Sequence, residues 1–232
     1  MAGPLPDPLR VSIIIPVLNE ADILGNSLEE LFTRPWLAAA AEVIVCDGGS
    51  DDSTLEVVRA YPCRLIRSES GRGVQMNRAS QAARGEYLLF LHADSRLPDA
   101  FDGDFPASGD WGFFRLRLDA AGLAYRIIET AINLRTRLTR VAGGDQGLYF
   151  RREFFNALQG YPAIPLMEDI AICKRARRKA EPVILDAALT SSSRRWLDNG
   201  VVKTVLLMWW LRFAYWLGVD PRRLHRLYYP RG

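Results

Sequence analysis

An apolar run over residues 87–91, which stops abruptly at His92, Ala93 and Asp94, constrains the fold of this chain more than any other feature. Turn-forming residues flank the run on both sides. A continuous apolar run of this length is typical of a strand that is buried on both faces of a parallel sheet. Such α/β sheets bind their ligands just beyond the carboxyl ends of the strands. The run therefore predicts an α/β fold in which Asp94 lies at a ligand site.

Asp94 has two interpretations at this position. A lone carboxylate at a strand end can hold Mg²⁺ or Mn²⁺, because such sites typically combine one or two carboxylates with phosphate oxygens of the substrate. Alternatively, Asp94 or Ser95 caps the turn that follows the strand. The choice between a metal site and a turn depends on the rest of the chain.

Strands and helices alternate through the N-terminal part of the chain. Apolar or β-branched runs predict the strands, and helical spacing fills the intervals between them. This alternation implies a mostly parallel sheet with right-handed crossovers. The predicted strands are 11–17, 42–46, 64–67 and 87–91, and the predicted helices are 21–34, 55–60 and one that starts near 72 and ends at 83.

Two of the intervening loops carry residues suited to a nucleotide. Asp47 follows the second strand and can accept hydrogen bonds from a base or a ribose, while Gly48 lets the backbone approach a ligand. Arg72 lies between glycines at the start of a helix, where a phosphate is favoured. The alternatives are an ordinary acidic turn and a solvent-exposed arginine.

The C-terminal part begins with a predicted loop over 99–110 and a strand over 111–118. An amphipathic helix follows over 122–140, and we expect its apolar stripe to face the core and its arginines to face solvent. Further along, Glu168 and Asp169 open another helix. Acidic residues in a first turn favour the helix dipole, but a carboxylate beside a substrate pocket can also act as a general base.

Residues 200–219 are almost wholly apolar, interrupted only by Lys203 and Arg212. The length approaches that of a membrane span. An arginine near the middle would cost about 3 kcal/mol on insertion, which disfavours a spanning helix. We therefore expect a helix that contacts either a membrane surface or a second copy in a homodimer, and the alternative is a helix packed on its own domain.

Charge and composition exclude several classes of protein. The net charge of +3 is too weak to predict a nucleic acid as the partner. The three cysteines are scattered, which favours buried thiols in a reducing compartment over a metal site or disulfides. Residues 1–10 lack the apolar core of a signal peptide. We therefore expect a cytoplasmic protein, and the apolar tail leaves open a peripheral contact on the inner face of the membrane.

Four motifs in a fixed order resemble those of the family 2 glycosyltransferases of GT-A fold. The motifs lie at 13–20, 45–54, 91–95 and 167–169, and the resemblance covers roughly residues 11–196. Residues 144–147, 167–169 and 194–196 look like those of a bacterial subgroup whose members often accompany radical-SAM and selenium-related genes.

The resemblance implies a GT-A-type three-layer sandwich around a mostly parallel nucleotide-binding sheet, followed by an apolar C-terminal helix. It also implies a single domain over residues 1–232. Its parts would be a nucleotide-binding half at 11–98, an acceptor or catalytic half at 99–198, and the apolar helix with a basic tail at 199–232.

The resemblance assigns a role to each matching residue. Asp94 would hold the metal, Mn²⁺ or Mg²⁺, and Asp169, with Glu168 beside it, would be the catalytic base. The nucleotide site would include Pro16, Glu20, Asp47, Gly48, Arg72, His92 and Ala93. The donor and acceptor would be bound by Gly144, Asp145, Gln146, Arg195 and Trp196.

The implied activity is inverting, metal-dependent transfer of a sugar from a UDP- or GDP-sugar to a hydroxyl acceptor, either lipid-linked or free. Two positions depart from the family pattern: His92 replaces the first Asp of the D-x-D motif, and Gly48 replaces the second Asp of Asp-Asp-Gly-Ser. One alternative is a non-catalytic partner that binds a nucleotide sugar. A nucleotidyltransferase is disfavoured, because no Gly-rich signature with a lysine follows the first strand.

Overall fold

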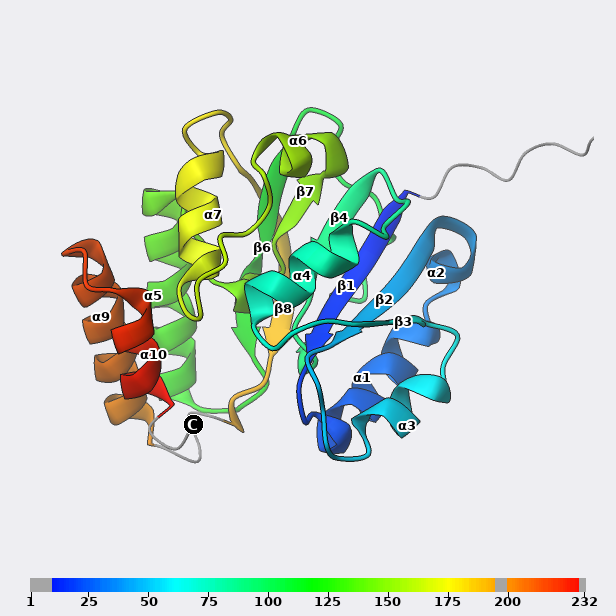
Figure 1. Cartoon of the computed structure of the whole chain (residues 1–232). Coiled ribbons are helices and arrows are strands. Elements are labelled where there is room, and N and C mark those ends of the chain that lie inside the picture. Colours follow the sequence, from blue (N-terminus) through cyan, green and yellow to red (C-terminus); the bar gives the residue numbers. More distant parts are fainter. Residues whose placement is uncertain (1–9, 195–199, 230–232) are drawn as a thin grey trace, which may run out of the picture.

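The computed structural model describes residues 10–194 and 200–229, and its centre is a mixed sheet of eight strands in the order β3-β2-β1-β4-β7-β6-β8-β5. Helices cover both faces of the sheet (Figure 1). Strand β3 and helix α3 lie toward one end of the molecule, and helices α5, α9 and α10 form the other (Figure 1). The predicted α/β sandwich is therefore confirmed.

The N-terminal half has the expected alternation of strands and helices. Its strands pair in parallel, and β1 lies between β2 and β4. The strands are β1 (Val11–Val17), β2 (Ala41–Asp47), β3 (Arg64–Arg67) and β4 (Tyr87–Phe90). The helices are α1 (Ala21–Phe32), α2 (Pro35–Ala40), α3 (Thr54–Arg59) and α4 (Arg72–Ser80).

The C-terminal half adds three antiparallel pairs to a sheet that is mostly parallel, as predicted. Strand β7 runs antiparallel to both β4 and β6, and β5 runs antiparallel to β8, whereas β6 and β8 are parallel. The strands are β5 (Ser95–Arg96), β6 (Trp111–Leu118), β7 (Tyr149–Arg151) and β8 (Val183–Ser191). The helices are α5 (Leu123–Thr139), η1 (Gly144–Gln146), α6 (Arg152–Ala157), α7 (Glu168–Ala176), α9 (Val201–Trp216) and α10 (Pro221–Tyr228).

Two cores lie on opposite faces of the sheet. Alternate residues of β1 divide between them: Ile14 joins a cluster with side chains of α4, α6 and α7, while Ile13 and Ile15 pack with side chains of α1 and α3. This division follows from the two-residue period of a strand. It explains why β1 and β4 are apolar at nearly every position, since both faces are covered.

Helix α5 is oriented opposite to the expectation, with its apolar stripe facing solvent. Leu123 and Leu138 are 77% and 73% exposed, and Ile127 and Leu134 are also exposed. The buried side chains of α5 are instead polar, namely Glu129 and Thr136. The expectation was wrong because helical periodicity identifies two faces but not which of them is covered.

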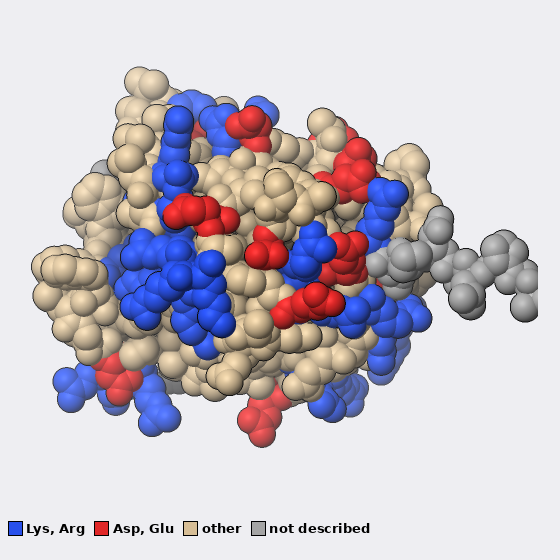
Figure 2. Space-filling view, turned by 90° about the horizontal axis from the view of Figure 1, so that it is seen from above, with Lys and Arg blue, Asp and Glu red and all other residues tan. Residues whose placement is uncertain are grey.

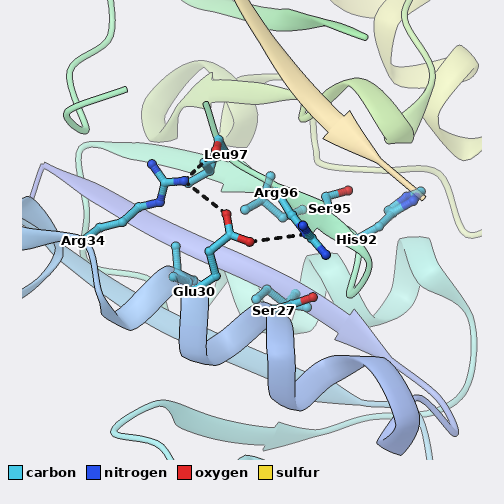
Figure 3. Close-up of a pocket in the computed structure, with 10 residues that line it drawn as sticks. Ser27, Glu30, Arg34, His92, Ser95, Arg96 and Leu97 are labelled. Atoms are coloured by element: carbon cyan, nitrogen blue, oxygen red, sulfur yellow. Dashed lines mark hydrogen bonds and ion pairs between the residues drawn. The ribbon is translucent and has the colours of Figure 1, made fainter. Parts of the chain in front are cut away.

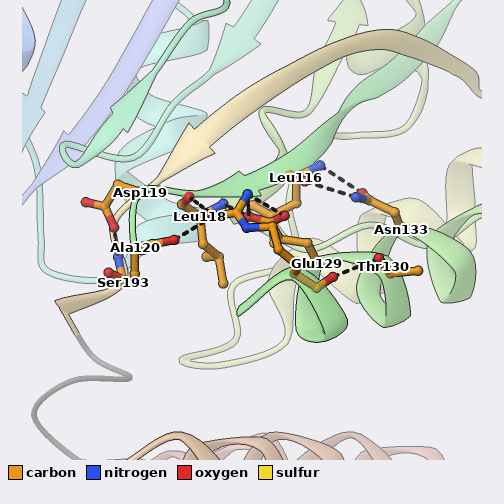
Figure 4. A network of polar contacts seen from close by, with 9 residues as sticks. Leu116, Leu118, Asp119, Ala120, Glu129, Thr130, Asn133 and Ser193 are labelled. Carbon is orange, nitrogen blue, oxygen red and sulfur yellow. Dashed lines mark hydrogen bonds and ion pairs between the residues drawn. The ribbon is translucent and has the colours of Figure 1, made fainter. Parts of the chain in front are cut away.

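The unpaired edge of β6 provides the physical reason (Figure 4). Strand β7 pairs with β6 only through Trp111 and Gly112, so the later backbone groups on that edge lack a strand partner. The side chain of Asn133 takes the place of a strand partner for Leu116. Its Oδ1 accepts from the Leu116 N–H at 2.8 Å, and its Nδ2 donates to the Leu116 carbonyl at 2.9 Å. Glu129 accepts from the Leu118 N–H at 2.5 Å. A buried backbone group without a partner is costly, so the polar face of α5 turns inward.

The C-terminal helices pack on the core that also holds α4 and α7. Leu211 and Ala214 of α9 and Leu224 of α10 are buried there. Among the residues that the structure describes, no helix has both the length and the apolar character needed to cross a membrane.

Adjacent positions of α5 test this orientation. We expect Asn133→Leu to lower the free energy of unfolding by about 2 kcal/mol, because two backbone groups of Leu116 lose their partners. Leu134→Gln, at an exposed position, should change it by less than about 0.5 kcal/mol. Urea denaturation of both variants measures the difference, and a larger loss for Leu134→Gln would contradict the orientation described for α5.

Candidate functional site

The carboxyl ends of β1, β2 and β4 meet at one edge of the sheet. Val17 at the end of β1 lies opposite Asp47 at the end of β2. The segment after β4 continues beside β1, where the Leu91 N–H donates to the Ile14 carbonyl at 3.0 Å. The predicted nucleotide residues of the three strands are therefore brought to the same edge.

The loops after β1 and β2 are tied together by hydrogen bonds. The Asn19 N–H donates to the Ser50 hydroxyl at 2.9 Å, and Asn19 Oδ1 accepts from the Asp51 N–H at 2.9 Å. The Glu20 N–H donates to the Thr54 hydroxyl at 2.9 Å. One of these loops follows Pro16 and the other follows Gly48. Joined by these bonds, the two loops form one wall of the site.

Asp47 orders its own loop. Its carboxylate is 1% exposed and accepts from the backbone N–H groups of Gly49 and Ser50, both at 3.1 Å. These are the contacts of the acidic turn that is the alternative interpretation of this loop, and a contact of Asp47 with a base or ribose stays a prediction. The carboxylate fixes the conformation of the loop that would contact a nucleotide.

Gln75 of α4 is a site residue that the sequence did not reveal. Its buried amide nitrogen donates to the carbonyls of Val17 and Cys46, at 2.7 and 2.8 Å, and so joins the ends of β1 and β2. A Cβ at Gly48 would lie 3.0 Å from the Gln75 side chain. A side chain at position 48 would therefore push the Gln75 amide by a few tenths of an ångström, and no periodic signal indicates such a contact.

His92 lies against Gly144 of η1. A Cβ at position 144 would be 2.7 Å from His92 Nε2, so glycine allows the two segments to meet. Burial, and secondly the nearby Arg72 cation, lower the pKa of His92, so the imidazole is neutral at neutral pH. Ala93, which lies between His92 and Asp94, is buried.

Asp94 is the carboxylate that is available for a metal. It is half-buried beside His92, and within residues 10–194 and 200–229 its carboxylate has no hydrogen-bond or ion-pair partner. No group of three or more His, Cys, Asp or Glu that could hold a metal gathers within those ranges. A single free carboxylate fits Mg²⁺ or Mn²⁺ when a substrate diphosphate supplies further ligands.

Arg72 and Glu168 form an ion pair between α4 and α7. The Nε and Oε1 atoms are 2.9 Å apart, and the Glu168 side chain is 2% exposed, with Oε2 buried and lacking a partner. Burial raises the pKa of Glu168, partly offset by the Arg72 cation. The pair engages Nε of Arg72 and Oε1 of Glu168, while the Arg72 side chain stays 38% exposed. The predicted roles of both residues at a substrate stay predictions.

Asp169 is held at the first turn of α7. Its Oδ2 accepts from the Gly144 N–H at 2.8 Å, and its Oδ1 accepts from the Ile170 N–H at 2.7 Å. Met167, which precedes α7, has a left-handed backbone with φ of 70°, an unusual conformation for a residue other than glycine. The half-buried Asp169 therefore stays in a fixed orientation next to η1.

The residues of η1 have different roles. Asp145 is half-buried and lies near His92. Its charge, like those of Asp94 and Asp169, raises the pKa of His92, but the opposite effect of burial is larger. Gln146 is fully buried and donates to the Phe114 carbonyl on the open edge of β6 at 3.2 Å. Gln146 thus fixes η1 on the sheet instead of contacting donor or acceptor, as had been expected.

Arg195 and Trp196 lie outside the described residues. Their neighbour Arg194 is described, and its Nη2 is 3.8 Å from Oε2 of Glu20. The end of β8 therefore reaches the loop that follows β1.

A small cavity lies behind His92 (Figure 3). Its volume of about 10 Å³ is at the lower limit for one water molecule. Glu30 on its wall pairs with Arg34 and with Arg96, each at 3.3 Å. The cavity is thus a gap in a polar network under the site and is too small for a nucleotide.

The chain is similar to known glycosyltransferases. The family model "Glycosyl transferase family 2" matches residues 12–103. Over 94 residues the chain is 32% identical to an uncharacterized glycosyltransferase, YibD, of Escherichia coli, covering 38% of this chain and 27% of that protein. It spans only 15% to 39% of the length of this and other curated relatives.

Solved structures show the same fold. The TarS 1–349 structure of S. aureus in complex with UDP-GlcNAc matches with a TM-score of 0.62 and 20% identity, over 79% of this chain and 58% of that one. The mannosyltransferase PcManGT of Pyrobaculum calidifontis, in complex with GDP-Man and Mn²⁺, matches with a TM-score of 0.62 and 19% identity, over 78% and 56% of the chains. These matches confirm the predicted GT-A fold.

The Arg72–Glu168 pair predicts a pH-dependent stability. Because the pKa of Glu168 is raised in the folded state, folding becomes less favourable as pH rises above its ordinary value of 4.5. Arg72→Leu removes the compensating cation, so its destabilisation should be small near pH 4 and reach about 2 kcal/mol at pH 7.5.

Chemical denaturation across this pH range measures the effect. The double variant Arg72→Leu/Glu168→Leu is the control, and it should lose the pH dependence. A destabilisation by Arg72→Leu that is equal at pH 4 and pH 7.5 would show that Glu168 does not depend on this cation.

Proposed function

We propose that this protein, in which residues 12–103 form a glycosyltransferase family 2 domain, transfers a sugar from a nucleoside diphosphate sugar to a hydroxyl acceptor. One observation supports this most strongly. Asp94, which has no partner among the described residues, follows His92 by two positions, and Asp169 accepts from the N–H of Gly144, the residue that lies against His92. A residue fit to hold a metal and a residue fit to act as a base therefore approach one strand edge from different halves of the chain.

The donor is proposed to be a UDP- or GDP-sugar. The matched structures carry UDP-GlcNAc in TarS and GDP-Man with Mn²⁺ in PcManGT. In this chain the joined loops after Pro16 and Gly48, including Glu20, would form the wall that receives the nucleotide. Arg72, whose side chain is 38% exposed beyond its contact with Glu168, can add positive charge for the diphosphate.

Asp94 would hold Mn²⁺ or Mg²⁺, which when bound neutralises the charge that develops on the departing diphosphate. The neutral His92 beside it can accept or donate a hydrogen bond at the same edge, and the Ala93 backbone can complete this wall. A buried, water-poor setting strengthens these electrostatic interactions.

Asp169 is proposed to remove the proton from the acceptor hydroxyl. The Gly144 N–H fixes its Oδ2, which aims the carboxylate before the acceptor arrives. The hydroxyl oxygen would then displace the diphosphate in a single step, with inversion at the anomeric carbon. Asp145 and Gly144 would border the acceptor, as would Arg195 and Trp196, which lie outside the described residues.

The acceptor is proposed to be lipid-linked, on the inner face of the membrane. Exposed apolar side chains on α9 support this, since a soluble sugar acceptor would not require them.

Ligand-dependent melting tests the donor site. We expect either UDP or GDP, together with Mn²⁺, to stabilise the protein by about 2.7 kcal/mol at a hundredfold excess over its dissociation constant. The stabilisation should disappear in Asp94→Ala and persist in Asp99→Ala, a control carboxylate that is exposed five positions downstream. Absence of a shift with UDP, GDP, CDP and dTDP would instead favour a protein without a donor site.

Replacement of the base tests the chemistry. Asp169→Asn should lower the rate of sugar transfer by about 10² to 10⁴, because a positioned general base contributes about that factor. The nucleotide-dependent melting shift should remain, and Asp186→Asn, at an exposed position on β8, should leave the rate unchanged. Ligand binding without turnover in the unaltered protein would point to a non-catalytic binding partner.

A further inference from the structure

We propose that the outward faces of α5 and α9 form a docking surface for an anionic phospholipid membrane. This surface, the α5–α9 surface, consists of exposed apolar side chains of the two helices, bordered by exposed cations. The described apolar members are Leu123, Ile127, Leu134, Leu138, Leu206, Trp209, Trp210, Phe213, Trp216 and Leu217.

The part from α5 is continuous along the helix. Residues 123, 127, 134 and 138 are spaced by multiples close to the helical turn, so their side chains align on one face. The opposite face is fixed to the open edge of β6 by Asn133 and Glu129. Because those hydrogen bonds hold the polar face inward, α5 cannot rotate to bury its leucines in the core.

The outward face of α9 is also apolar, but for a different reason. The helix is apolar on all sides, and its inner face already packs on the core through Leu211 and Ala214. Its outer face is left with Trp209 and Trp216, which are 67% and 70% exposed. A helix that is apolar all round requires cover on both faces.

The two helices lie at the same end of the molecule. Figure 1 shows α5 and α9 together, at the end away from β3. Burial, and secondly the charge of Arg212 on α9, lower the pKa of Arg135 on α5 to about 10, so these two side chains are close to each other. Both helices therefore present exposed apolar side chains at the same end of the molecule.

Charge distinguishes this region from the rest of the chain. Helices α5, α9 and α10 contain eight lysines and arginines and a single acidic residue, the buried Glu129. The three helices thus carry +7, whereas the remaining residues carry −4, given whole-chain totals of 30 basic and 27 acidic residues. Every fully exposed charge within these helices is positive, namely Arg137, Lys203, Arg222, Arg223 and Arg226.

The end of α7 adds further cations next to α9. Figure 2 shows a dense group of lysine and arginine side chains toward the end of the molecule where α9 lies. Lys174 of α7 contacts the ring of Tyr215 on α9, with Nζ 5.0 Å from the ring centroid. Arg177 and Arg178 lie close enough to lower the pKa of Lys174, after the larger effect of burial.

These features fit a lipid surface better than a second copy of the chain. A symmetric dimer through the same region would place +7 against +7, which opposes association. Anionic headgroups would neutralise the cations, each contributing about 1 kcal/mol near the surface, or about fivefold in affinity. Tryptophans such as Trp209 and Trp216 are favoured at the headgroup level, and a helix of 16 residues lies on a bilayer more readily than across it.

Flotation of the full-length protein with vesicles tests the proposal. We expect binding to phosphatidylcholine vesicles that contain phosphatidylglycerol, much weaker binding to phosphatidylcholine alone, and release by salt. Trp209→Glu/Trp216→Glu on α9 and, separately, Leu138→Glu on α5 should each reduce binding by about tenfold or more. These positions are exposed, so the variants should fold, as their melting temperatures will verify.

Two charge-reversal variants separate specific docking from general attraction. Arg222→Glu/Arg223→Glu should reduce binding by about tenfold or more, whereas Arg59→Glu/Arg64→Glu, with the same change in net charge at the opposite end of the molecule, should reduce it far less. Equal effects would overturn the assignment to this surface. Absence of vesicle binding would also overturn it, as would a homodimer that Trp209→Glu/Trp216→Glu dissociates.

Discussion

The ion pair between Arg72 and Glu168 is the contact on which the candidate site depends, because it joins the two halves of the chain at the point where they meet. Arg72 begins α4 in the nucleotide half, and Glu168 begins α7 in the half that carries Asp169. Asn77 strengthens the contact with two hydrogen bonds of 2.8 Å to the backbone of Tyr161. A buried ion pair stabilises little by itself, but breaking it leaves a buried charge without compensation, so it fixes one arrangement of α4 and α7.

A second constraint shapes the other half of the molecule. Strand β6 has an edge that no neighbouring strand covers, and side chains from η1 and α5 bond to its backbone groups. Gln146 reaches Phe114 from η1, and this bond keeps the adjacent Gly144 against Asp169. The same edge turns the leucines of α5 outward. The orientation of Asp169 and the exposed apolar face of α5 thus have the same cause, which is that the backbone groups on the edge of β6 need hydrogen-bond partners.

The sequence predicted the N-terminal half well because its strands are buried on both faces and their apolar runs are unambiguous. It also predicted that Asp94 would lie just beyond the carboxyl end of the buried strand that became β4. It failed for α5, since an amphipathic pattern does not say which face is covered. The structural roles of Gln75 and Gln146 depend on contacts between residues far apart in the chain, such as Gln75 with Val17, and no local pattern encodes them.

The amide of Gln75 has a consequence for how this site can vary among related sequences. It occupies the space that a side chain at position 48 would need, because a Cβ there would lie 3.0 Å from it. An aspartate at position 48 would therefore push the Gln75 amide by a few tenths of an ångström and disturb its hydrogen bonds to the carbonyls of Val17 and Cys46. Positions 48 and 75 are thus coupled, because the size of the side chain at 48 sets how far the amide at 75 must move from the ends of β1 and β2.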